Sequence, residues 1–350
     1  MNQAYTGCWT ALVTPFGKDF AVDWESLKRN VDFQIEEGIN GILPMGTTGE
    51  SATVAHGEHA EVIARVAGWA AGKTNVLAGT GSNSTDEAIH ETKLAVNAGV
   101  KTCLLVDCYY NKPSSLELRK EYYGRILSAF PETEFIAYAI PGRSVTVILP
   151  EDLAILRSEH PNLVAVKEAT GDFERMKRTR TLLPEEFNIF SGDDPNTTRM
   201  MTDTSIGACG VISVISNITP ASIVEMTRLL LNGKTDEAAV IDEALKPLFQ
   251  MVGVATTEKI KLPDGSTAEV TYKFPNPVPI KTMMAGVGMM DGRCKPPMGK
   301  LTKGGVKKVR EGLKQVWRNY PKALEPIAEF YDVDVAERLD KDKYWKPLSY

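Results

Sequence analysis

The residue that stands out for its chemistry is Lys167, which interrupts an apolar run. In Leu163-Val-Ala-Val-Lys167-Glu168 its amine falls inside a segment that otherwise has the composition of a buried strand. Lysine is rarely buried alone, because an ammonium group is costly to remove from water. Lys167 either faces a buried carboxylate such as Glu168 or extends to the surface, or its amine stays neutral and forms a Schiff base with a keto acid. The Schiff-base interpretation requires a pKa about three units below the usual ~10.4.

Hydroxyl groups and one arginine follow other apolar runs. The glycines, N–H groups and hydroxyls of Gly46-Thr-Thr-Gly-Glu-Ser51 suit a bound carboxylate, although Thr and Ser before a helix are also common caps. Tyr109 and Tyr110 end one run and Tyr138 ends another, where a tyrosine can pass a proton or simply pack. Arg143 follows a Pro-Gly turn and could bind a carboxylate through two hydrogen bonds or make a surface ion pair.

These side chains need a scaffold that gathers the ends of several strands. Up to about residue 235, short apolar runs alternate with segments of helical periodicity, as in parallel sheets covered by helices. The count of runs favours a closed (β/α)8 TIM barrel, whose loops meet at one face; a doubly wound sheet is the alternative. The predicted strands are Trp9–Val13, Gly41–Met45, Asn75–Gly79, Thr102–Val106, Glu134–Ile140, Leu163–Glu168, Phe187–Ser191 and Ala208–Val214.

A C-terminal helical appendage is predicted after the barrel. Its organisation is residues 1–235 as catalytic barrel, 236–320 as helical region and 321–350 as extension. Thr256–Phe274 is predicted to form a hairpin, because two strand-like segments flank Pro263-Asp-Gly-Ser266. The tail Tyr320–Tyr350 mixes aromatic and charged residues and should pack on the body or on a neighbouring subunit. The predicted helices are Pro220–Asn232, Thr235–Val252, Val278–Gly286 and Thr302–Val316.

Composition excludes several classes of function. The net charge of −5 gives no basic surface for nucleic acid or an anionic membrane, and the apolar runs are too short to span a bilayer. Met1 to Gly7 lacks the features of a signal peptide, so a cytoplasmic location is expected. Five scattered cysteines read as free buried thiols, and four histidines form no HExxH pattern. Neither a metal nor an organic cofactor is expected, since no dinucleotide loop or P-loop is complete.

Taken together, these segments resemble the dihydrodipicolinate synthase and N-acetylneuraminate lyase family. The resemblance covers roughly residues 5–318, apart from the hairpin, and the family's usual pattern lacks both the hairpin and the tail after Tyr320. The chain also departs from that pattern at Cys108, Ala139 and Gly142. The motifs that carry the resemblance, in order, are Gly46-Thr-Thr-Gly-Glu-Ser51, Tyr109-Tyr-Asn-Lys-Pro113, Tyr138-Ala-Ile-Pro-Gly-Arg143, Val166-Lys-Glu-Ala-Thr-Gly171, Ser191-Gly-Asp-Asp194, Gly210-Val-Ile-Ser-Val214 and Pro275-Asn-Pro-Val-Pro-Ile-Lys281.

The resemblance implies a lyase that condenses pyruvate with L-aspartate 4-semialdehyde to 4-hydroxy-tetrahydrodipicolinate, on the route to diaminopimelate and lysine. By resemblance, Lys167 forms the imine with pyruvate. Tyr138 relays protons through Thr47 to Tyr110, which would reach in from the adjacent subunit. The remaining substrate contacts that it implies are Thr48 for the pyruvate carboxylate, the Ile212 carbonyl in the pocket and Arg143 for the carboxylate of the semialdehyde.

The resemblance also implies regulation and assembly. Members inhibited by L-lysine bind it at a dimer interface, and the family expectation is a homotetramer built as a dimer of dimers. A polar helix face with a loop, without any effector, is the alternative. The residues at the matching effector positions are Ser51, His56, His59, Asn83, Glu87 and Tyr109.

Two other functions remain open at this point. The chain could be a different pyruvate lyase of the same family, such as an N-acetylneuraminate lyase, a keto-deoxy-sugar-acid aldolase or a hydratase-aldolase. It could also be a catalytically silent keto-acid-binding protein on the same fold. Intact Lys167, Tyr138, Thr47 and Tyr110 argue against the silent protein, and Arg143 together with the lysine pocket argues against the other lyases.

Overall fold

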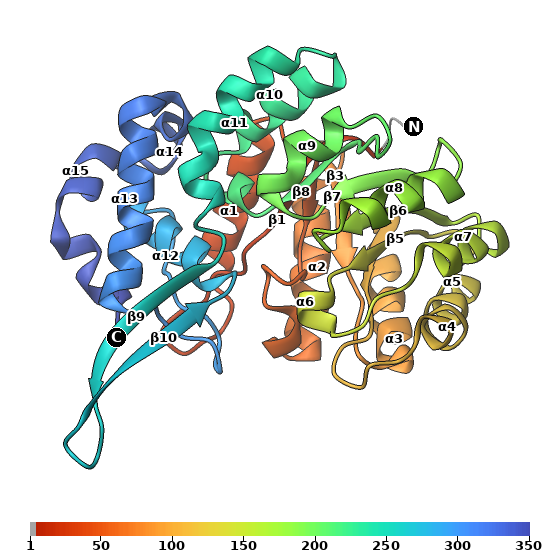
Figure 1. Ribbon diagram of the computed structural model, residues 1–350, viewed down its shortest axis with the longest axis horizontal. Helices are drawn as coiled ribbons and strands as arrows, with labels where there is room; N and C mark the ends of the chain where they lie inside the picture. Colours follow the sequence, from red (N-terminus) through yellow and green to blue (C-terminus); the bar gives the residue numbers. More distant parts are fainter. Residues whose placement is uncertain (1–4) are drawn as a thin grey trace.

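Parallel strands close into a barrel in chain order, as Figure 1 shows. The computed structural model describes residues 5–350, so the expectation about Met1 to Gly7 falls largely outside the described residues. The closed barrel confirms the (β/α)8 prediction over the doubly wound sheet, and each predicted strand is present with its ends shifted by two residues or fewer. Within residues 5–350 the barrel strands are β1 Gly7–Ala11, β2 Gly41–Leu43, β3 Asn75–Gly79, β4 Thr102–Val106, β5 Glu134–Ala139, β6 Leu163–Glu168, β7 Asn188–Ser191 and β8 Gly210–Ser213.

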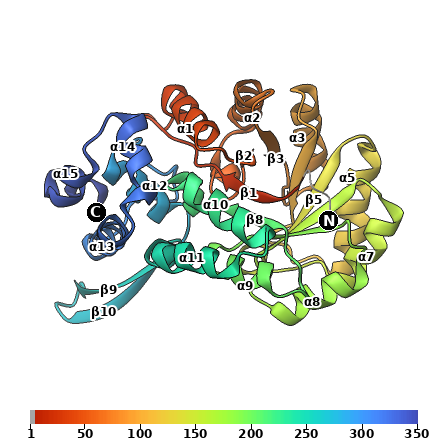
Figure 2. The ribbon, with the colours of Figure 1, turned by 90° about the horizontal axis from the view of Figure 1, so that it is seen from above.

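Helices surround the barrel and separate its strands from solvent (Figure 2). Several begin at a side chain that accepts a hydrogen bond from a free N–H group of the first turn, as Asp23, Ser84 and Asp172 do. Such caps set where each helix starts and therefore where the preceding loop ends. The helices of this layer are α1 Trp24–Glu36, α2 His56–Ala70, α3 Thr85–Asn97, α4 Ser115–Glu117, α5 Gly124–Ala129, α6 Pro141–Ser144, α7 Pro150–Glu159, α8 Phe173–Leu182, α9 Thr197–Thr202 and α10 Pro220–Leu231.

The barrel strands bury both of their faces, in two separate apolar clusters. Side chains such as Trp9, Leu77 and Phe190 fill the interior, while a larger cluster lies between the strands and the helices. Neighbouring residues of a strand point to opposite faces. In β6, Ala165 belongs to the interior cluster and Val166 to the outer one, so the next two residues also face opposite sides.

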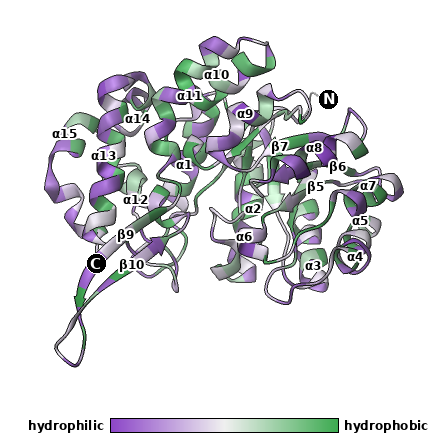
Figure 3. Cartoon of the chain, in the orientation of Figure 1, coloured by the Kyte–Doolittle hydropathy of each residue, from purple (hydrophilic) through white to green (hydrophobic). Residues whose placement is uncertain are grey.

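The C-terminal region adds helices and a hairpin beside the barrel. The strands β9 Val254–Lys261 and β10 Thr267–Phe274 pair antiparallel along their whole length, which confirms the predicted hairpin and lengthens its strands. Figure 1 shows this hairpin projecting from the body. Hydrophilic and hydrophobic residues alternate along the last long helix, α13, in Figure 3, and its buried face contains the predicted Val306, Val309, Leu313 and Val316. The helices of this region are α11 Thr235–Phe249, α12 Val278–Val287, α13 Lys303–Asn319, α14 Glu325–Tyr331 and α15 Val335–Asp340.

The tail after residue 320 packs against the body of its own chain. The indole of Trp345 is 2% exposed and lies over Gly286 of α12, where an added Cβ would come within 2.2 Å of the ring. The Arg338 Nε donates to the carbonyl of Gly286 at 3.0 Å, and the Tyr331 hydroxyl donates to Asn30 of α1 at 2.8 Å. The tail therefore holds the C-terminal end of α12 in place.

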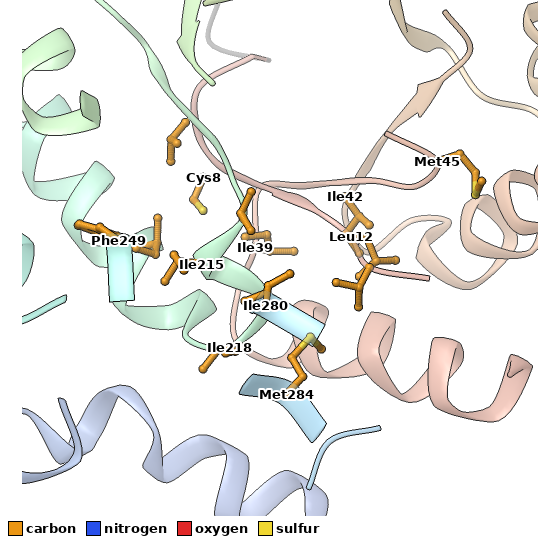
Figure 4. Packing of buried hydrophobic residues seen from close by; sticks show 14 of the residues in the cluster. Cys8, Leu12, Ile39, Ile42, Met45, Ile215, Ile218, Phe249, Ile280 and Met284 are labelled. Atoms are coloured by element: carbon orange, nitrogen blue, oxygen red, sulfur yellow. The ribbon is translucent and has the colours of Figure 1, made fainter. Parts of the chain in front are cut away.

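Helix α12 in turn packs against the barrel. Its Ile280 and Met284 lie in one apolar cluster with Leu12 and Ile218, as Figure 4 shows. In the described part of the chain, no helix is both long and apolar enough to cross a membrane.

Candidate active site and effector pocket

The amine of Lys167 lies in the barrel interior without a charged partner. The residue is 4% exposed, and its Nζ lies 4.3 Å from the ring centroid of Tyr138. Within residues 5–350, this amine has no hydrogen bond or ion pair. Burial lowers its pKa to about 7, with Asp194 acting in the opposite direction and Arg143 adding to the decrease. A large fraction of the amine is therefore neutral near pH 7.

The alternative partner for Lys167, Glu168, is excluded by the geometry of β6. Its side chain points outward, is fully buried and pairs with Arg175 of α8, whose Nε lies 3.2 Å from Oε1. The interpretation that Lys167 faces Glu168 is therefore wrong, because adjacent residues of a strand lie on opposite faces. The extension to the surface is excluded too, since Lys167 is buried.

Tyr138 lies next to Lys167 and connects it to the loop after β2. The two residues are direct neighbours in the register of β5 and β6. Burial raises the pKa of Tyr138 to about 12, opposed by the nearby Arg143 and by a hydrogen bond with the side chain of Thr47. The phenol is thus protonated at neutral pH and can exchange a proton with Thr47.

The loop after β2 also contains Thr48, whose hydroxyl is held by Asn276, a residue that the sequence analysis did not single out. The Asn276 Nδ2 donates to the Thr48 Oγ1 at 2.9 Å, and the Asn276 carbonyl accepts from the Arg143 Nη2 at 2.8 Å. Asn276 thus connects the two side chains that the resemblance assigns to the two substrate carboxylates. The sequence contains one indication of this role, because Asn276 belongs to the motif that ends at Lys281. Ile212 is buried in β8, in the same interior cluster as Tyr138.

A pocket of about 280 Å³ opens beside these residues. Its wall contains Thr47, Tyr109, Arg143 and Asn276, so of the predicted substrate contacts Arg143 lines the pocket, while Thr48 and Ile212 do not. Lys167 is not part of this wall, since it lies almost entirely covered, and Thr47 is the connection between the two.

Tyr110 is the one predicted catalytic residue among residues 5–350 that the chain does not bring to the others. It is 81% exposed and has a positive φ of 78°, a backbone conformation that non-glycine residues rarely adopt. The loop therefore turns this ring away from its own barrel and into solvent.

The six residues predicted to bind an effector lie in the wall of a second pocket, of about 380 Å³. The sequence missed one further member, Glu91, which is one helical turn beyond Glu87 on α3. The Glu91 carboxylate lies 3.0 Å from the Nδ1 atoms of both His56 and His59. Burial opposes its ionisation, but these two histidines leave the pKa of Glu91 below its ordinary value. The pocket is therefore lined by two carboxylates and two imidazoles.

The two pockets have part of their walls in common. The shared residues are Ser51, Ala52, Gly81 and Tyr109. The loop from β2 to α2 thus contributes to both pockets, with Thr47 on one side and His56 on the other.

The cysteines are free and buried, as expected. Burial raises the thiol pKa of Cys103 and Cys108 to about 12, so both remain protonated. No group of three or more potential ligands that could hold a metal ion occurs among the described residues.

Comparisons with known proteins agree on one family. A model of the Dihydrodipicolinate synthetase family matches residues 4–316. The chain is 36% identical to the 4-hydroxy-tetrahydrodipicolinate synthase of Stutzerimonas stutzeri over 311 residues, which are 88% of this chain and 97% of that relative. The solved dihydrodipicolinate synthase of Aquifex aeolicus covers 92% of this chain and 100% of its own, with a TM-score of 0.80 and 34% identity. The corresponding protein of Cyanidioschyzon merolae, solved with lysine bound, has a TM-score of 0.79 and 31% identity and covers 89% of this chain and 98% of its own.

Proposed function

The chain belongs to the dihydrodipicolinate synthetase family, and we propose that it acts as a 4-hydroxy-tetrahydrodipicolinate synthase with Lys167 as its nucleophile. It condenses pyruvate with L-aspartate 4-semialdehyde in the pathway to diaminopimelate and lysine. The observation that supports the role of Lys167 is a buried amine without a carboxylate partner, held against a tyrosine ring in the barrel interior. A cytoplasmic location is part of the same proposal.

The first step joins pyruvate to the protein. The neutral amine of Lys167 attacks the ketone carbon, and the Thr48 hydroxyl holds the pyruvate carboxylate. Tyr138 passes a proton to the carbinolamine hydroxyl, which leaves as water, and an imine forms between Lys167 and the former ketone carbon. The Ile212 carbonyl lines the pocket at this stage. Thr47 returns a proton to Tyr138, with Tyr110 of a second subunit at the end of the relay.

The second step uses the imine as an electron sink. It acidifies the pyruvate methyl group, which loses a proton and becomes the nucleophilic carbon of an enamine. This carbon attacks the aldehyde of the semialdehyde, whose carboxylate Arg143 holds, and the aldehyde oxygen takes up the proton that the methyl group gave to the relay of Tyr138 and Thr47. The amino group of the bound product then attacks the imine carbon and displaces the Lys167 amine. The ring closes as 4-hydroxy-tetrahydrodipicolinate, and Lys167 is free again.

Reductive trapping tests the nucleophile. Borohydride added in the presence of pyruvate should leave a stable adduct at Lys167, located by peptide mass spectrometry. Absence of an adduct there would contradict the proposal and favour a silent keto-acid-binding protein. Rates with aspartate semialdehyde, N-acetylmannosamine and sugar-derived aldehydes then separate this synthase from the other pyruvate lyases.

We further propose that the second pocket binds L-lysine as a feedback inhibitor. Two carboxylates, Glu87 and Glu91, suit the ammonium groups of lysine, while Tyr109 and a histidine suit its carboxylate. A related protein has been solved with lysine bound, and the shared wall gives a short route to the active site. Lysine up to millimolar concentration should lower the rate, and Glu87→Gln should weaken this inhibition. An unchanged rate in the wild-type protein would remove the effector from the proposal.

The assembly proposed for this chain is a homotetramer built from two tight dimers. The exposed ring of Tyr110 supports this assembly, because in a dimer the ring would complete the active site of the partner subunit. Mass measurement by light scattering at micromolar protein tests the assembly, and a monomer with full activity would contradict it.

A further inference from the structure

A second buried lysine lies behind the active-site loop, and it is paired. The Lys281 Nζ of α12 lies 2.6 Å from the Glu50 Oε1, and neither side chain is exposed. The other carboxylate oxygen of Glu50 accepts from the backbone N–H of Lys295 at 2.7 Å. Residues 231 positions apart in the sequence are thus joined in the interior of the protein.

The same contacts form a closed ring with Thr14, which lies in the loop after the first barrel strand. The Lys281 Nζ also donates to the carbonyl of Thr14 at 2.8 Å, and the Thr14 hydroxyl donates to the carbonyl of Gly49 at 2.7 Å. The ring therefore holds the loop at two successive residues, Gly49 and Glu50. Glu50 has a positive φ of 64°, so the loop is fixed in a conformation that its own backbone does not favour.

This ring lies directly behind the residues that meet pyruvate. Glu50 is two residues after Thr48, the proposed ligand of the pyruvate carboxylate, and three after Thr47, which is hydrogen-bonded to Tyr138. The opposite end of the pair is rigid, because α12 packs on the barrel and its C-terminal end is held by Arg338 and the tail (Figure 4). A fixed helix thus sets the position of a loop that would otherwise depend on a short turn.

The stability of the fold does not by itself explain why this buried ion pair is present. Two charges lose their hydration on burial, and well-packed apolar residues of similar size often stabilise a core equally well. An ion pair with oriented hydrogen bonds, in contrast, fixes one geometry. A misplacement of about 1 Å at a reacting group can cost ~100-fold in rate, so a loop that holds substrate benefits from such a fixed point.

We propose that Glu50 and Lys281 are positioning residues, which hold Thr47 and Thr48 at the distance from Lys167 that pyruvate binding and imine formation require. This inference rests on the proposed function, because it assumes that pyruvate reacts at Lys167. It adds a role for an ion pair whose two side chains are fully covered, although Glu50 belongs to the wall of the first pocket.

The test compares three variants in the full-length protein. Glu50→Gln keeps the shape of the side chain but places an amide between two donors, Lys281 and the N–H of Lys295. Thr14→Val keeps the volume of the side chain and removes the hydrogen bond of its hydroxyl to Gly49, together with a longer one to the Met45 sulfur. Tyr331→Phe is the matched control, because it removes a buried hydrogen bond between α1 and the tail that is not part of the ring of contacts around Glu50 and Lys281.

Each variant is measured by thermal unfolding, by the fraction of Lys167 trapped with saturating pyruvate and borohydride, and by kinetics per trapped site. Glu50→Gln should lower kcat/KM for pyruvate ~10- to 100-fold, mainly through KM, while KM for the semialdehyde changes less than about threefold. Thr14→Val should have the same pattern at ~3- to 10-fold, and it keeps the inference testable if Glu50→Gln does not fold. Tyr331→Phe should lower the Tm and leave both KM values unchanged.

A lower Tm in Glu50→Gln and Thr14→Val with unchanged kcat/KM for pyruvate per trapped site would overturn the positioning role. Equal losses for both substrates would overturn it as well, because they would indicate general damage to the site. A wild-type protein that forms no adduct would instead contradict the proposed function, so the two failures are distinguishable.

Discussion

Two buried lysines in this protein have opposite environments. Lys281 is fully covered and meets a carboxylate at 2.6 Å and a carbonyl at 2.8 Å. Lys167 is 4% exposed, and its amine contacts, within the part of the chain that the structure describes, only the ring of Tyr138, at the same 4.3 Å at which the Lys281 amine lies from the ring of Phe16. Both amines are therefore buried beside an aromatic ring, and the carboxylate is the difference. Burial alone does not make an amine nucleophilic; burial without a counter-charge does.

The local structure explains how the carboxylate is withheld from Lys167. Its neighbour Glu168 faces the helices and pairs with Arg175. Asp194 lies in the vicinity but is bound elsewhere, since its carboxylate accepts from the Ser213 hydroxyl and from the N–H of Val214 at 2.9 Å. Burial also raises the pKa of Asp194 to about 6. Each nearby acid is thus engaged by another group.

The largest expected effect comes from removing the unpaired amine. Lys167→Ala should reduce turnover by at least ~10⁴-fold, because no other group can form the imine. Steady-state kinetics measure the loss, and circular dichroism checks that the barrel is folded. Residual activity within 100-fold of the wild type would mean that the unpaired lysine is not the nucleophile.

The paired amine should show its effect in stability. Lys281→Met leaves the buried Glu50 carboxylate without its ion-pair partner, with the N–H of Lys295 still bound to its other oxygen, which should lower the free energy of unfolding by ~3–5 kcal/mol. Denaturant unfolding measures this change. Combining Lys281→Met with Glu50→Leu removes both charges and should recover most of the loss. If Lys281→Met proved as stable as the wild type, the contrast between the two lysines would be lost.

Removing the hydroxyl of Tyr110 tests whether the unpaired amine also needs a proton relay. Tyr110→Phe should slow turnover ~10- to 1000-fold by interrupting that relay, with little change in stability because the ring is exposed. The neighbouring Tyr109→Phe is the comparison: Tyr109 lines both pockets, and its main expected effect is on inhibition by lysine. Normal turnover in Tyr110→Phe would exclude the relay.

The smallest expected effect is the change in the rate of imine formation over one pH unit. The Lys167 amine reacts in its neutral form, and its pKa is lowered to about 7. The rate of imine formation with pyruvate should therefore rise about tenfold per pH unit below 7 and level off above it. Stopped-flow measurements between pH 5.5 and 9.5 would resolve the curve. A rate that keeps rising to pH 9.5 would indicate an ordinary, solvated ammonium group.

The barrel can be predicted from the sequence because buried parallel strands are nearly continuous apolar runs. The strands β3, β4 and β6 begin and end at the predicted residues. The hairpin was recognised from its turn, but its strands extend further, because Thr256 and Phe274 at its base pack on the body. Lys167 was left between two interpretations, although strand alternation by itself argued against Glu168 as its partner.

The candidate site was harder to predict wherever it depends on distant pairs. Glu91 could have been found from its spacing of four residues after Glu87 on one helix. Asn276 and the pair of Glu50 with Lys281 had no local signal, because the partners are far apart in sequence. Tyr110 is exposed in this chain, and its proposed place in the relay lies in a second subunit, which the pattern of one sequence does not describe.

The common wall of the two pockets has a practical consequence for the proposed inhibition by lysine. Ser51 and Tyr109 line both pockets, so a ligand in the second pocket would contact residues that also line the first. Small shifts of these two side chains would suffice as the signal. A synthetic inhibitor large enough to displace Ser51 and Tyr109 would therefore affect both the proposed synthesis and its proposed inhibition by lysine.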